Sequence, residues 1–408
     1  MKDGQKELGL SHGKIPQPQI PASVWVLGFV SMLMDISSEM VHGLLPLFLV
    51  TVLGASASIV GLVEGVGESI AQISKILSGV LSDCFGKRKG LVVFGYALSA
   101  VTKPLFAIAP SVSVVMSARL LDRVGKGMRG APRDAMMADL TPPNIRGAAF
   151  GLRQSLDNVG AFLGPLLAVG LMLLLSNDYR TVFWIAGAPG LMAVALLVFG
   201  LRVPLPSLQI NKHTNAVRWE IFHCLTGAYW WVVGIGAVFT LARFSEAFLV
   251  LRAQKVGMPV ALVPLVMVVM NLFYSVSAYP FGKLSDHMNH RNLLIFGLVV
   301  LIAADILLAI ASHWVTILAG VVLWGAHMGI TQGLLSAMVA DVAPADLRGT
   351  TYGIFSLVCG IVALLANLIA GLLWDKFGAP ATFFFGAGFC VTAIVGLFLL
   401  SNRQLIDN

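Results

Sequence analysis

The chain has 408 residues, of which 57% are hydrophobic and only 12% are charged, whereas soluble globular proteins carry about 25% charged residues. No soluble domain can bury so much apolar surface, so the excess must face lipid. The net charge of +7 does not indicate a nucleic-acid partner, because the cations stand in short joints between apolar segments. The composition therefore excludes a soluble protein and indicates an integral membrane protein.

The first 20 residues are polar and lack the apolar core of a cleavable signal. The first hydrophobic helix is therefore expected to act as an uncleaved insertion signal. Beyond it, apolar runs of about 20 residues or more recur without the period-two alternation of barrel strands, which favours helices. Twelve spans are predicted, at 23–52, 57–82, 90–109, 112–138, 146–175, 180–201, 226–253, 258–285, 291–311, 314–341, 348–374 and 378–401.

The joints between these spans alternate in charge. The cation-rich set carries Lys87, Arg88, Lys89, Arg146, Arg202, Lys212, Arg218, Arg291 and Arg348. Because cations stay on the cytoplasmic side, both termini are predicted to be cytoplasmic, in a plasma or bacterial inner membrane. The predicted domains are an N-terminal tail (1–22), a six-helix bundle (23–201), a cytoplasmic linker (202–225), a second six-helix bundle (226–401) and a C-terminal tail (402–408).

Two motifs occur twice in the chain, in one register. The sequence GVLSD at Gly79–Asp83 recurs as GKLSD at Gly282–Asp286, 203 residues later. The longer AMMADLTPPNIRGAAFG at Ala135–Gly151 recurs as AMVADVAPADLRGTTYG at Ala337–Gly353, 202 residues later. Internal duplication of a six-helix unit is typical of transporters, whose substrate site lies between the halves near mid-bilayer.

The joint after the second span resembles the signature of the major facilitator superfamily: Gly79, Leu81, Ser82, Asp83 and Gly86, then Lys87 and Arg88. Cys84 stands where that family usually has arginine. The resemblance covers nearly the whole chain and implies an all-α membrane protein with twelve transmembrane helices in two pseudo-symmetric six-helix bundles.

The same resemblance implies a cytoplasmic latch, in which Asp83 accepts hydrogen bonds from the start of the eleventh span near Arg348. A static topology anchor is the alternative interpretation. The predicted gate residues are Gly79, Asp83, Gly86, Lys87, Arg88, Gly282, Asp286 and Arg291.

A second motif lies on the fifth span, where Gly151, Gly160, Gly164 and Pro165 have the spacing of the glycine-proline motif of proton-driven drug antiporters. Small residues at such intervals also serve close helix packing, whatever the direction of transport. The motif therefore favours antiport only slightly.

Ionisable residues interrupt several apolar spans. Each costs about 2.5–3.5 kcal/mol at mid-bilayer, so each is expected to face a partner or a water-filled cavity. The candidate substrate or coupling-ion residues are Asp35, Glu39, Glu64, Glu68, Asp122, Arg123, Lys126, Arg153, Asp157, Arg243, Glu246 and His327.

Two interpretations of these charges stay open. In one they neutralise each other, for example Arg153 with Asp157 and Glu68 with Lys126. In the other they form a functional network, since apolar packing would be as stable as buried ion pairs. Glu64 and Glu68 are like charges four residues apart, so without a cation beside them one would hold a proton.

The coupling carboxylate is predicted to be Glu39, Glu68 or Asp157. The two acids on the second span, with Asp122, also resemble the sodium site of melibiose-type symporters, which leaves sodium coupling as an alternative. His327 and the Arg243–Glu246 pair are as consistent with packing as with transport, and Asp305 has no partner in the sequence pattern.

The function expected from these features is secondary active transport of a small solute by alternating access, coupled to protons, with an organic anion favoured by the cations of the fourth span. Proton-driven efflux of a drug or metabolite is the alternative, and a non-transporting sensor is the alternative from another class. No nucleotide loop, metal cluster or nucleophile–base arrangement is seen, so no enzyme activity, cofactor, metal or nucleic-acid partner is predicted. The chain is expected to be monomeric.

Overall fold

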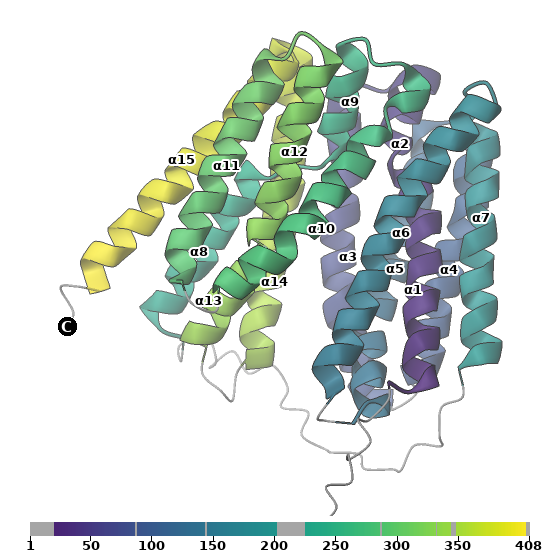
Figure 1. The fold of residues 1–408 in the computed structure, drawn as a ribbon, viewed down its shortest axis with the longest axis horizontal. Helices are drawn as coiled ribbons and strands as arrows, with labels where there is room; N and C mark the ends of the chain where they lie inside the picture. Colours follow the sequence, from purple (N-terminus) through teal and green to yellow (C-terminus); the bar gives the residue numbers. More distant parts are fainter. Residues whose placement is uncertain are drawn as a thin grey trace, which may run out of the picture.

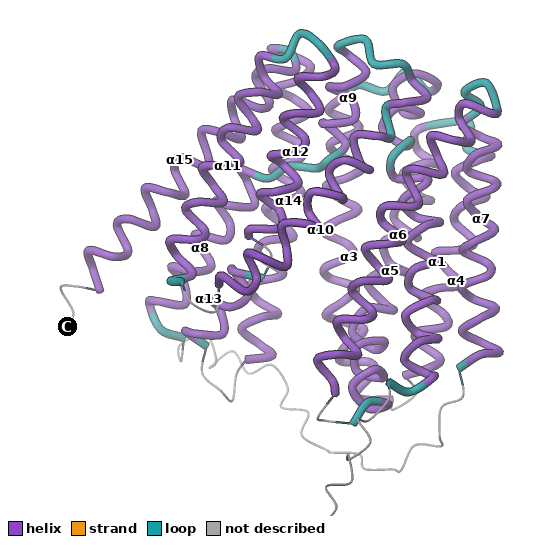
Figure 2. The backbone as a smooth tube through the Cα atoms, viewed as in Figure 1, coloured by secondary structure: helices purple, strands orange, loops and turns teal. Residues whose placement is uncertain are grey.

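The computed structural model describes residues 20–85, 88–142, 145–201, 225–285, 288–331, 333–343 and 348–404. These residues form helices joined by short turns, and no strand occurs among them (Figure 2). The helices stand side by side as two groups, one from each half of the sequence (Figure 1).

The first group contains the elements of residues 22–200. Its helices are α1 (Ala22–His42), α2 (Leu45–Leu47), α3 (Ala57–Phe85), α4 (Arg88–Ile108), α5 (Val112–Leu140), α6 (Arg146–Leu174) and α7 (Tyr179–Ala195). π-helical turns at Phe48–Val52 and Leu196–Gly200 extend α2 and α7. Each predicted span of this half therefore corresponds to one long helix or to one run of short ones.

The second group repeats this arrangement. Its helices are α8 (Gly227–Ala242), α9 (Ala247–Lys255), α10 (Leu265–Ser285), α11 (His290–Ile310), α12 (Trp314–Thr331), α13 (Leu334–Val342), α14 (Arg348–Phe377) and α15 (Ala379–Gln404). The chain is non-helical between α8 and α9, so the seventh predicted span is a broken helix. A 3₁₀ turn at Val260–Leu262 precedes α10.

Ten segments within the described residues are long and apolar enough to cross a membrane. They are Ala22–Val52, Arg88–Ile108, Arg146–Leu174, Tyr179–Gly200, Gly227–Lys255, Val260–Ser285, His290–Ile310, Trp314–Thr331, Thr351–Phe377 and Ala379–Leu399. The remaining two predicted spans are α3 and α5, which are 29 residues long each and carry most of the buried charges. The predicted twelve-helix fold is therefore confirmed.

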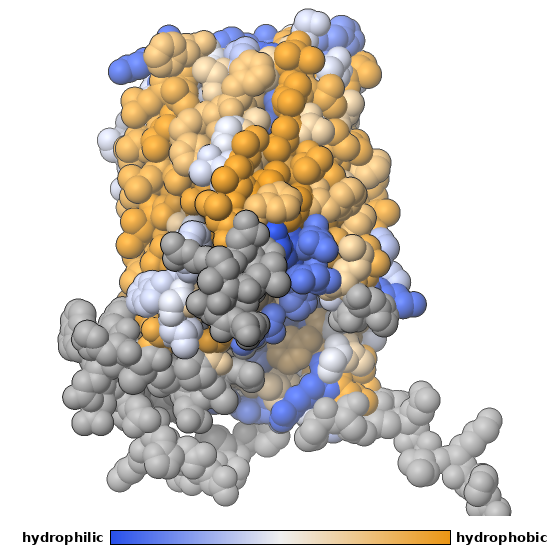
Figure 3. Space-filling view, turned by 90° about the vertical axis from the view of Figure 1, so that its left-hand side faces the viewer, coloured by the Kyte–Doolittle hydropathy of each residue, from blue (hydrophilic) through white to orange (hydrophobic). Residues whose placement is uncertain are grey.

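The outer surface fits burial in a membrane. In Figure 3, apolar side chains cover most of the visible face, and hydrophilic side chains gather toward its two ends. Large apolar residues such as Phe199 and Leu174 are more than three-quarters exposed, which is unfavourable in water and favourable in lipid.

The two halves meet mainly through α3 with α14 and α6 with α10. At one end of the molecule, the Asp375 carboxylate accepts hydrogen bonds from the backbone N–H groups of Ala57 at 3.0 Å and Ser58 at 2.9 Å, and from the Ser58 hydroxyl. We call this the Asp375 end. The opposite end, where α3 approaches α4, is called the Arg88 end.

Further hydrogen bonds join the halves nearer the middle. Ser69 Oγ donates to the Gly360 carbonyl at 2.6 Å, and Asn271 Nδ2 donates to the Ala161 carbonyl at 3.0 Å. Toward the Arg88 end the two groups of helices diverge (Figure 1). The halves are thus held together from the Asp375 end to about mid-height.

The predicted tails and the linker at 202–225 lie almost entirely outside the described residues.

The internal duplication is visible in side-chain contacts. Arg88 pairs with Asp139 in the first half, and His290 Nδ1 lies 3.3 Å from Asp341 Oδ2 in the second. Both pairs join residues 51 positions apart, and they are related by the 202-residue repeat.

Candidate functional site

A cavity of about 530 Å³ lies between the two halves. One wall comes from α1, α3 and α5, and the facing wall comes from the break between α8 and α9 and from α10, α12 and α14. A central cavity shared by two pseudo-symmetric halves is the place where a transporter binds its substrate. The two walls differ sharply in chemistry.

The wall from the first half is charged. Residues three or four apart share one face of a helix, so α1 presents Glu39 and His42, α3 presents Glu64, Glu68 and Gln72, and α5 presents Arg123 and Lys126. Of the three carboxylates predicted as coupling groups, Glu39 and Glu68 line this cavity. The third, Asp157, does not.

A chain of alternating charges crosses this wall. Arg119 Nη2 donates to Glu64 Oε2 at 2.5 Å, and both side chains are almost completely buried. His42 lies between two carboxylates, with Nε2 3.5 Å from Glu64 Oε2 and Nδ1 3.6 Å from Glu39 Oε2. The chain therefore connects α5, α3 and α1 through one imidazole.

The sequence predicts that Glu64 or Glu68 holds a proton unless a cation lies beside them, and the structure places cations and an amide there. Arg119 provides the cation for Glu64, while Glu68 Oε1 accepts a hydrogen bond from Gln72 Nε2 at 3.1 Å. Arg123 lies within electrostatic range of both acids. Each acid therefore has a neighbour that stabilises its charge, and repulsion between them does not require either to hold a proton.

Two cations of α5 that line the main cavity form no ion pair with another described residue. Neither Arg123 nor Lys126 forms an ion pair or hydrogen bond with another described residue, and Arg123 Nε is buried and unsatisfied. Lys126 is exposed, and both residues line the cavity. The cavity wall therefore offers positive charge to a solute.

A small pocket of about 20 Å³ adjoins the main cavity and is lined by Asp35, Asp122 and Arg129, among others. Asp122 is engaged there, because Lys103 Nζ donates to its Oδ1 at 2.8 Å. Lys103 is only 1% exposed, and sequence reasoning missed it although it interrupts an apolar span. Asp35 forms no ion pair or hydrogen bond with another described residue.

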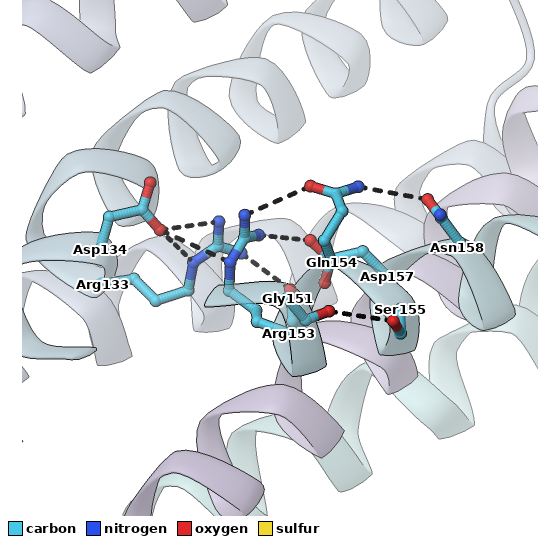
Figure 4. A network of polar contacts seen from close by, with 9 residues as sticks. Arg133, Asp134, Gly151, Arg153, Gln154, Ser155, Asp157 and Asn158 are labelled. Carbon is cyan, nitrogen blue, oxygen red and sulfur yellow. Dashed lines mark hydrogen bonds and ion pairs between the residues drawn. The ribbon is translucent and has the colours of Figure 1, made fainter. Parts of the chain in front are cut away.

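Arg153 and Asp157 lie away from the cavity and pair with each other on α6, as one interpretation expected. Arg153 Nε also lies 3.9 Å from Asp134 Oδ1, which is 3.1 Å from Arg133 Nη2 (Figure 4). Arg133 Nη1 in turn donates to Ser31 Oγ at 2.7 Å. These residues tie α6 to α5 and α1 and do not contact the cavity.

The wall from the second half is mostly apolar, and its apolar lining residues are Phe239, Phe244, Met267, Met270, Met328, Leu335, Phe355 and Ala363. Its charged members, Arg243 and Glu246, lie at the helix break with Arg243 Nη2 3.9 Å from Glu246 Oε1. The break is held by Asn367, whose Oδ1 accepts from Ser245 N at 2.7 Å.

His327 does not line the cavity. It is fully buried, its Nδ1 lies 2.8 Å from the Gly297 carbonyl oxygen, and its ring packs against Phe239. In the first half Gly95 and Gly125 occupy the equivalent positions, and a Cβ on Gly95 would lie 2.7 Å from the Gly125 carbonyl. This arrangement matches the packing interpretation of His327.

The gate motif is described only in part. The side chains of Asp83 and Arg348, and residues Gly86, Lys87 and Asp286, lie outside the described residues, so the predicted latch stays a prediction. Of the other gate residues, Arg88 pairs with Asp139, and the Arg291 guanidinium lies 5.2 Å from the Phe398 ring. Gly79 faces Ala131, and Gly282 has open space around it.

The glycine-proline motif of α6 packs this helix on the charged helix α1. A Cβ on Gly160 would lie 2.9 Å from the Cβ of Asp35, and one on Gly164 would lie 2.7 Å from the Cβ of Glu39. Pro165 is buried beside them, whereas Gly151 has nothing within 4 Å. The motif therefore lets α6 pack closely against α1 at the positions of its two carboxylates, Asp35 and Glu39.

Comparison with known proteins agrees with this architecture. The model of the Major Facilitator Superfamily matches residues 27–253 and 232–405. An uncharacterized MFS-type transporter of Methanocaldococcus jannaschii is 35% identical over 389 residues, which are 94% of this chain and 95% of the relative. The quinolone resistance protein NorA of Staphylococcus aureus is 24% identical, with 86% of this chain and 90% of NorA covered.

Two solved structures show the same fold. A mutant of the nucleoside transporter NupG superposes with a TM-score of 0.77 at 12% identity and covers 92% of this chain and 99% of its own. A POT family transporter in complex with 5-aminolevulinic acid has a TM-score of 0.76 at 13% identity, with 93% and 95% covered. At these identities the likeness concerns the fold alone.

Proposed function

We propose that this chain, which belongs to the major facilitator superfamily, is a proton-coupled secondary transporter of a small organic anion that works by alternating access. The observation that carries the proposal is the pair of unpartnered cations, Arg123 and Lys126, on the wall of the central cavity. Arg123 is buried and Lys126 is exposed toward the cavity, and neither forms an ion pair with another described residue, so a bound carboxylate or phosphate would stabilise both cations.

The contacts between the halves support a state closed at the Asp375 end. The hydrogen bonds of Asp375, Ser69 and Asn271 join the halves from that end to mid-height. Arg88, Lys89, Arg146 and Arg291 of the cation-rich joints lie at the Arg88 end. We therefore assign that end and both termini to the cytoplasm of a plasma or bacterial inner membrane. Exposing the cavity to the other side requires the contacts of Asp375 to break.

The coupling site in this proposal is the cluster of Glu39, His42 and Glu64. Histidine is the side chain whose charge changes most readily near neutral pH, and His42 lies within 3.6 Å of a carboxylate oxygen on each side. Glu39 lines both the main cavity and the small pocket beside it. A proton arriving from the cavity can thus be shared between α1 and α3.

Efflux of an amphipathic drug or metabolite is the second candidate. The similarity to a quinolone resistance protein supports it, as does the wall of methionine and phenylalanine side chains that faces the charged wall. Methionine-rich surfaces adapt to ligands of different shape. The two candidates differ in the charge of the solute that the cavity selects.

The test uses purified protein in liposomes that contain a pH-sensitive dye. A pH gradient is imposed, and uptake is measured for radiolabelled organic carboxylates, phosphate esters and cationic drugs, in sodium and in choline buffers. Proton-coupled anion transport predicts that carboxylates or phosphate esters accumulate together with a dye signal, without need for sodium. Accumulation of the cationic drugs alone would favour the second candidate instead.

Two variants sharpen this test. Arg123→Gln is expected to lower uptake of the anion about tenfold or more, because a hydrogen bond to a charged group is worth about 1.5–3 kcal/mol. Lys75→Gln is the matched control, since Lys75 is an exposed cation on α3 that does not line the cavity. Equal uptake by both variants, or no uptake of any solute class by the wild type, would contradict the proposal.

A further inference from the structure

Asp305 is a buried carboxyl group that the proposed mechanism does not use. It lies on α11, five residues before the helix ends at Ile310, and is 0% exposed. Neither of its carboxylate oxygens has a hydrogen-bond partner. Glu64 and Glu68 of the cavity wall have a cation or an amide beside them. Asp305 differs from them because no described side chain donates to its carboxyl.

The internal duplication shows what Asp305 lacks. In the first half, Lys103 on α4 forms a buried ion pair with Asp122 on α5. A shift of 202 residues, the repeat of the longer motif, places Asp305 at the position of Lys103 and Trp324 at that of Asp122. Trp324 is also fully buried, and its Nε1 has no hydrogen-bond acceptor. The position that holds a satisfied cation in one half thus holds an unsatisfied acid in the other.

The Asp305 carboxyl faces a space that is left open by a glycine. A Cβ on Gly386 of α15 would lie 2.7 Å from Asp305 Oδ2 and 3.1 Å from the carbonyl oxygen of Ala242. Ala242 is the last residue of α8, just before the helix break. Asp305 Oδ2 and the Ala242 carbonyl oxygen are therefore at most about 6 Å apart. A carboxylate and a helix C-terminus are both negative and both accept hydrogen bonds, so a proton or another cation at Asp305 is favoured.

Among the described residues, no cation forms an ion pair with Asp305. On α9, Arg252 donates to the carbonyls of Leu308, Ala309 and Ala311 at the end of α11. At the helix break, Arg243 lies beside Glu246 on the cavity wall. On α12, His327 contacts Gly297, about two helical turns from Asp305. On α15, the titratable neighbour is the buried thiol of Cys390, which carries no positive charge.

We propose that Asp305 is a proton-binding site of the second half, which holds a proton on its carboxyl, in the space it shares with Gly386 and the Ala242 carbonyl, while the Asp375 end is closed. An ionised carboxylate without a partner is far more costly in an apolar interior than the neutral acid, which can donate one hydrogen bond. The proton would be released when the junction of α8 and α9 moves away from α15. This last step rests on the proposed transport function, whereas protonation itself does not.

Infrared spectroscopy of the purified protein tests the protonation directly. A protonated carboxylic acid has a C=O stretch that is separate from the bands of carboxylates and shifts in D₂O. The wild type at pH 7 is expected to show such a band, which Asp305→Asn removes. Asp178→Asn is the matched control: Asp178 is an exposed aspartate outside the spans, and the Thr181 hydroxyl lowers the pKa of its carboxyl, so the band is expected to remain.

A second variant keeps the test independent of that substitution. Gly386→Ala places a methyl group in the space beside Asp305 Oδ2 and is expected to shift the acid band. A spectrum without any acid band that depends on Asp305 would overturn the proposal. So would a band that disappears in sodium but not in choline chloride, because the occupant would then be a sodium ion.

The coupling role has its own measurement in the liposome assay. Asp305→Asn cannot release a proton, whereas the cluster of Glu39, His42 and Glu64 still can, so accumulation of the solute driven by the pH gradient is expected to fall below the wild-type ratio. Wild-type accumulation in this variant would overturn the coupling role. If the wild type moves no solute, the proposed function fails, while the infrared result still decides whether Asp305 carries a proton.

Discussion

Arg119 and Glu64 form a buried ion pair across the contact of α5 with α3, with Arg119 Nη2 2.5 Å from Glu64 Oε2. Glu64 also faces His42, and its second oxygen, Oε1, is buried without a partner. Each side chain of this pair therefore depends on the other, and the pair fixes the charged wall of the cavity.

Replacement of Arg119 by leucine is expected to destabilise the protein by up to about 3–5 kcal/mol, because the buried Glu64 carboxylate loses its closest cation and keeps only the more distant His42, at 3.5 Å. The double variant Arg119→Leu/Glu64→Gln is expected to recover much of this loss. Thermal unfolding in detergent measures both. Equal losses in the single and the double variant would show that the ion pair does not hold the wall.

Gly164→Ala is expected to destabilise the contact of α6 with α1 by about 1–3 kcal/mol, because the new methyl group would lie 2.7 Å from the Glu39 Cβ and 2.9 Å from the Ile36 carbonyl. Gly151→Ala on the same helix is the control, since nothing lies within 4 Å of it. That variant is expected to be neutral or to gain up to about 1 kcal/mol. Thermal unfolding that ranks the two in the opposite order would contradict the packing role of the motif.

Asp375→Asn is expected to open the Asp375 end more often, because its carboxylate holds Ala57 and Ser58 of the other half. Cys359 lines the cavity and reports on this opening. In a protein whose other cysteines are serine, labelling of Cys359 by an impermeant maleimide from the Asp375 side is expected to become several-fold faster.

Asp178→Asn is the control for this labelling experiment. Asp178 caps the start of α7 within one half, where Arg180 N and Thr181 N donate to it. Its loss leaves the contacts between the halves intact. Labelling that accelerates equally in both variants would mean that general loosening, rather than release of the Asp375 contact, exposes the cavity.

Asp178→Ala is expected to destabilise the protein by about 1 kcal/mol at neutral pH, as for other helix caps. The hydrogen bond from the Thr181 hydroxyl lowers the pKa of Asp178 in the folded protein. The stabilisation is therefore present above the unfolded-state pKa and is lost as the pH falls through the lowered value. Unfolding curves of the two proteins are expected to converge below about pH 3, and a difference that persists there would contradict the assignment.

The sequence by itself determined the number, limits and duplication of the helices. Each span must satisfy its own backbone in lipid, so about 20 consecutive apolar residues carry the information locally. The two charged helices were also found, because Glu64, Glu68 and the cations of α5 interrupt otherwise apolar runs. The break between α8 and α9 was not predicted, since the seventh span was expected to be one continuous helix at 226–253. The repeated motifs likewise showed, from short sequence patterns, that the two halves are copies of one six-helix unit.

The partners of the buried charges were decided only by the tertiary structure. Glu64 pairs with Arg119, Asp122 pairs with Lys103, and Asp157 lies outside the cavity. A helical period says which residues share a face, but the rotation of a helix against its neighbours depends on close contacts such as those of Gly160 and Gly164. Those contacts join residues far apart in the chain, so no local pattern contains them.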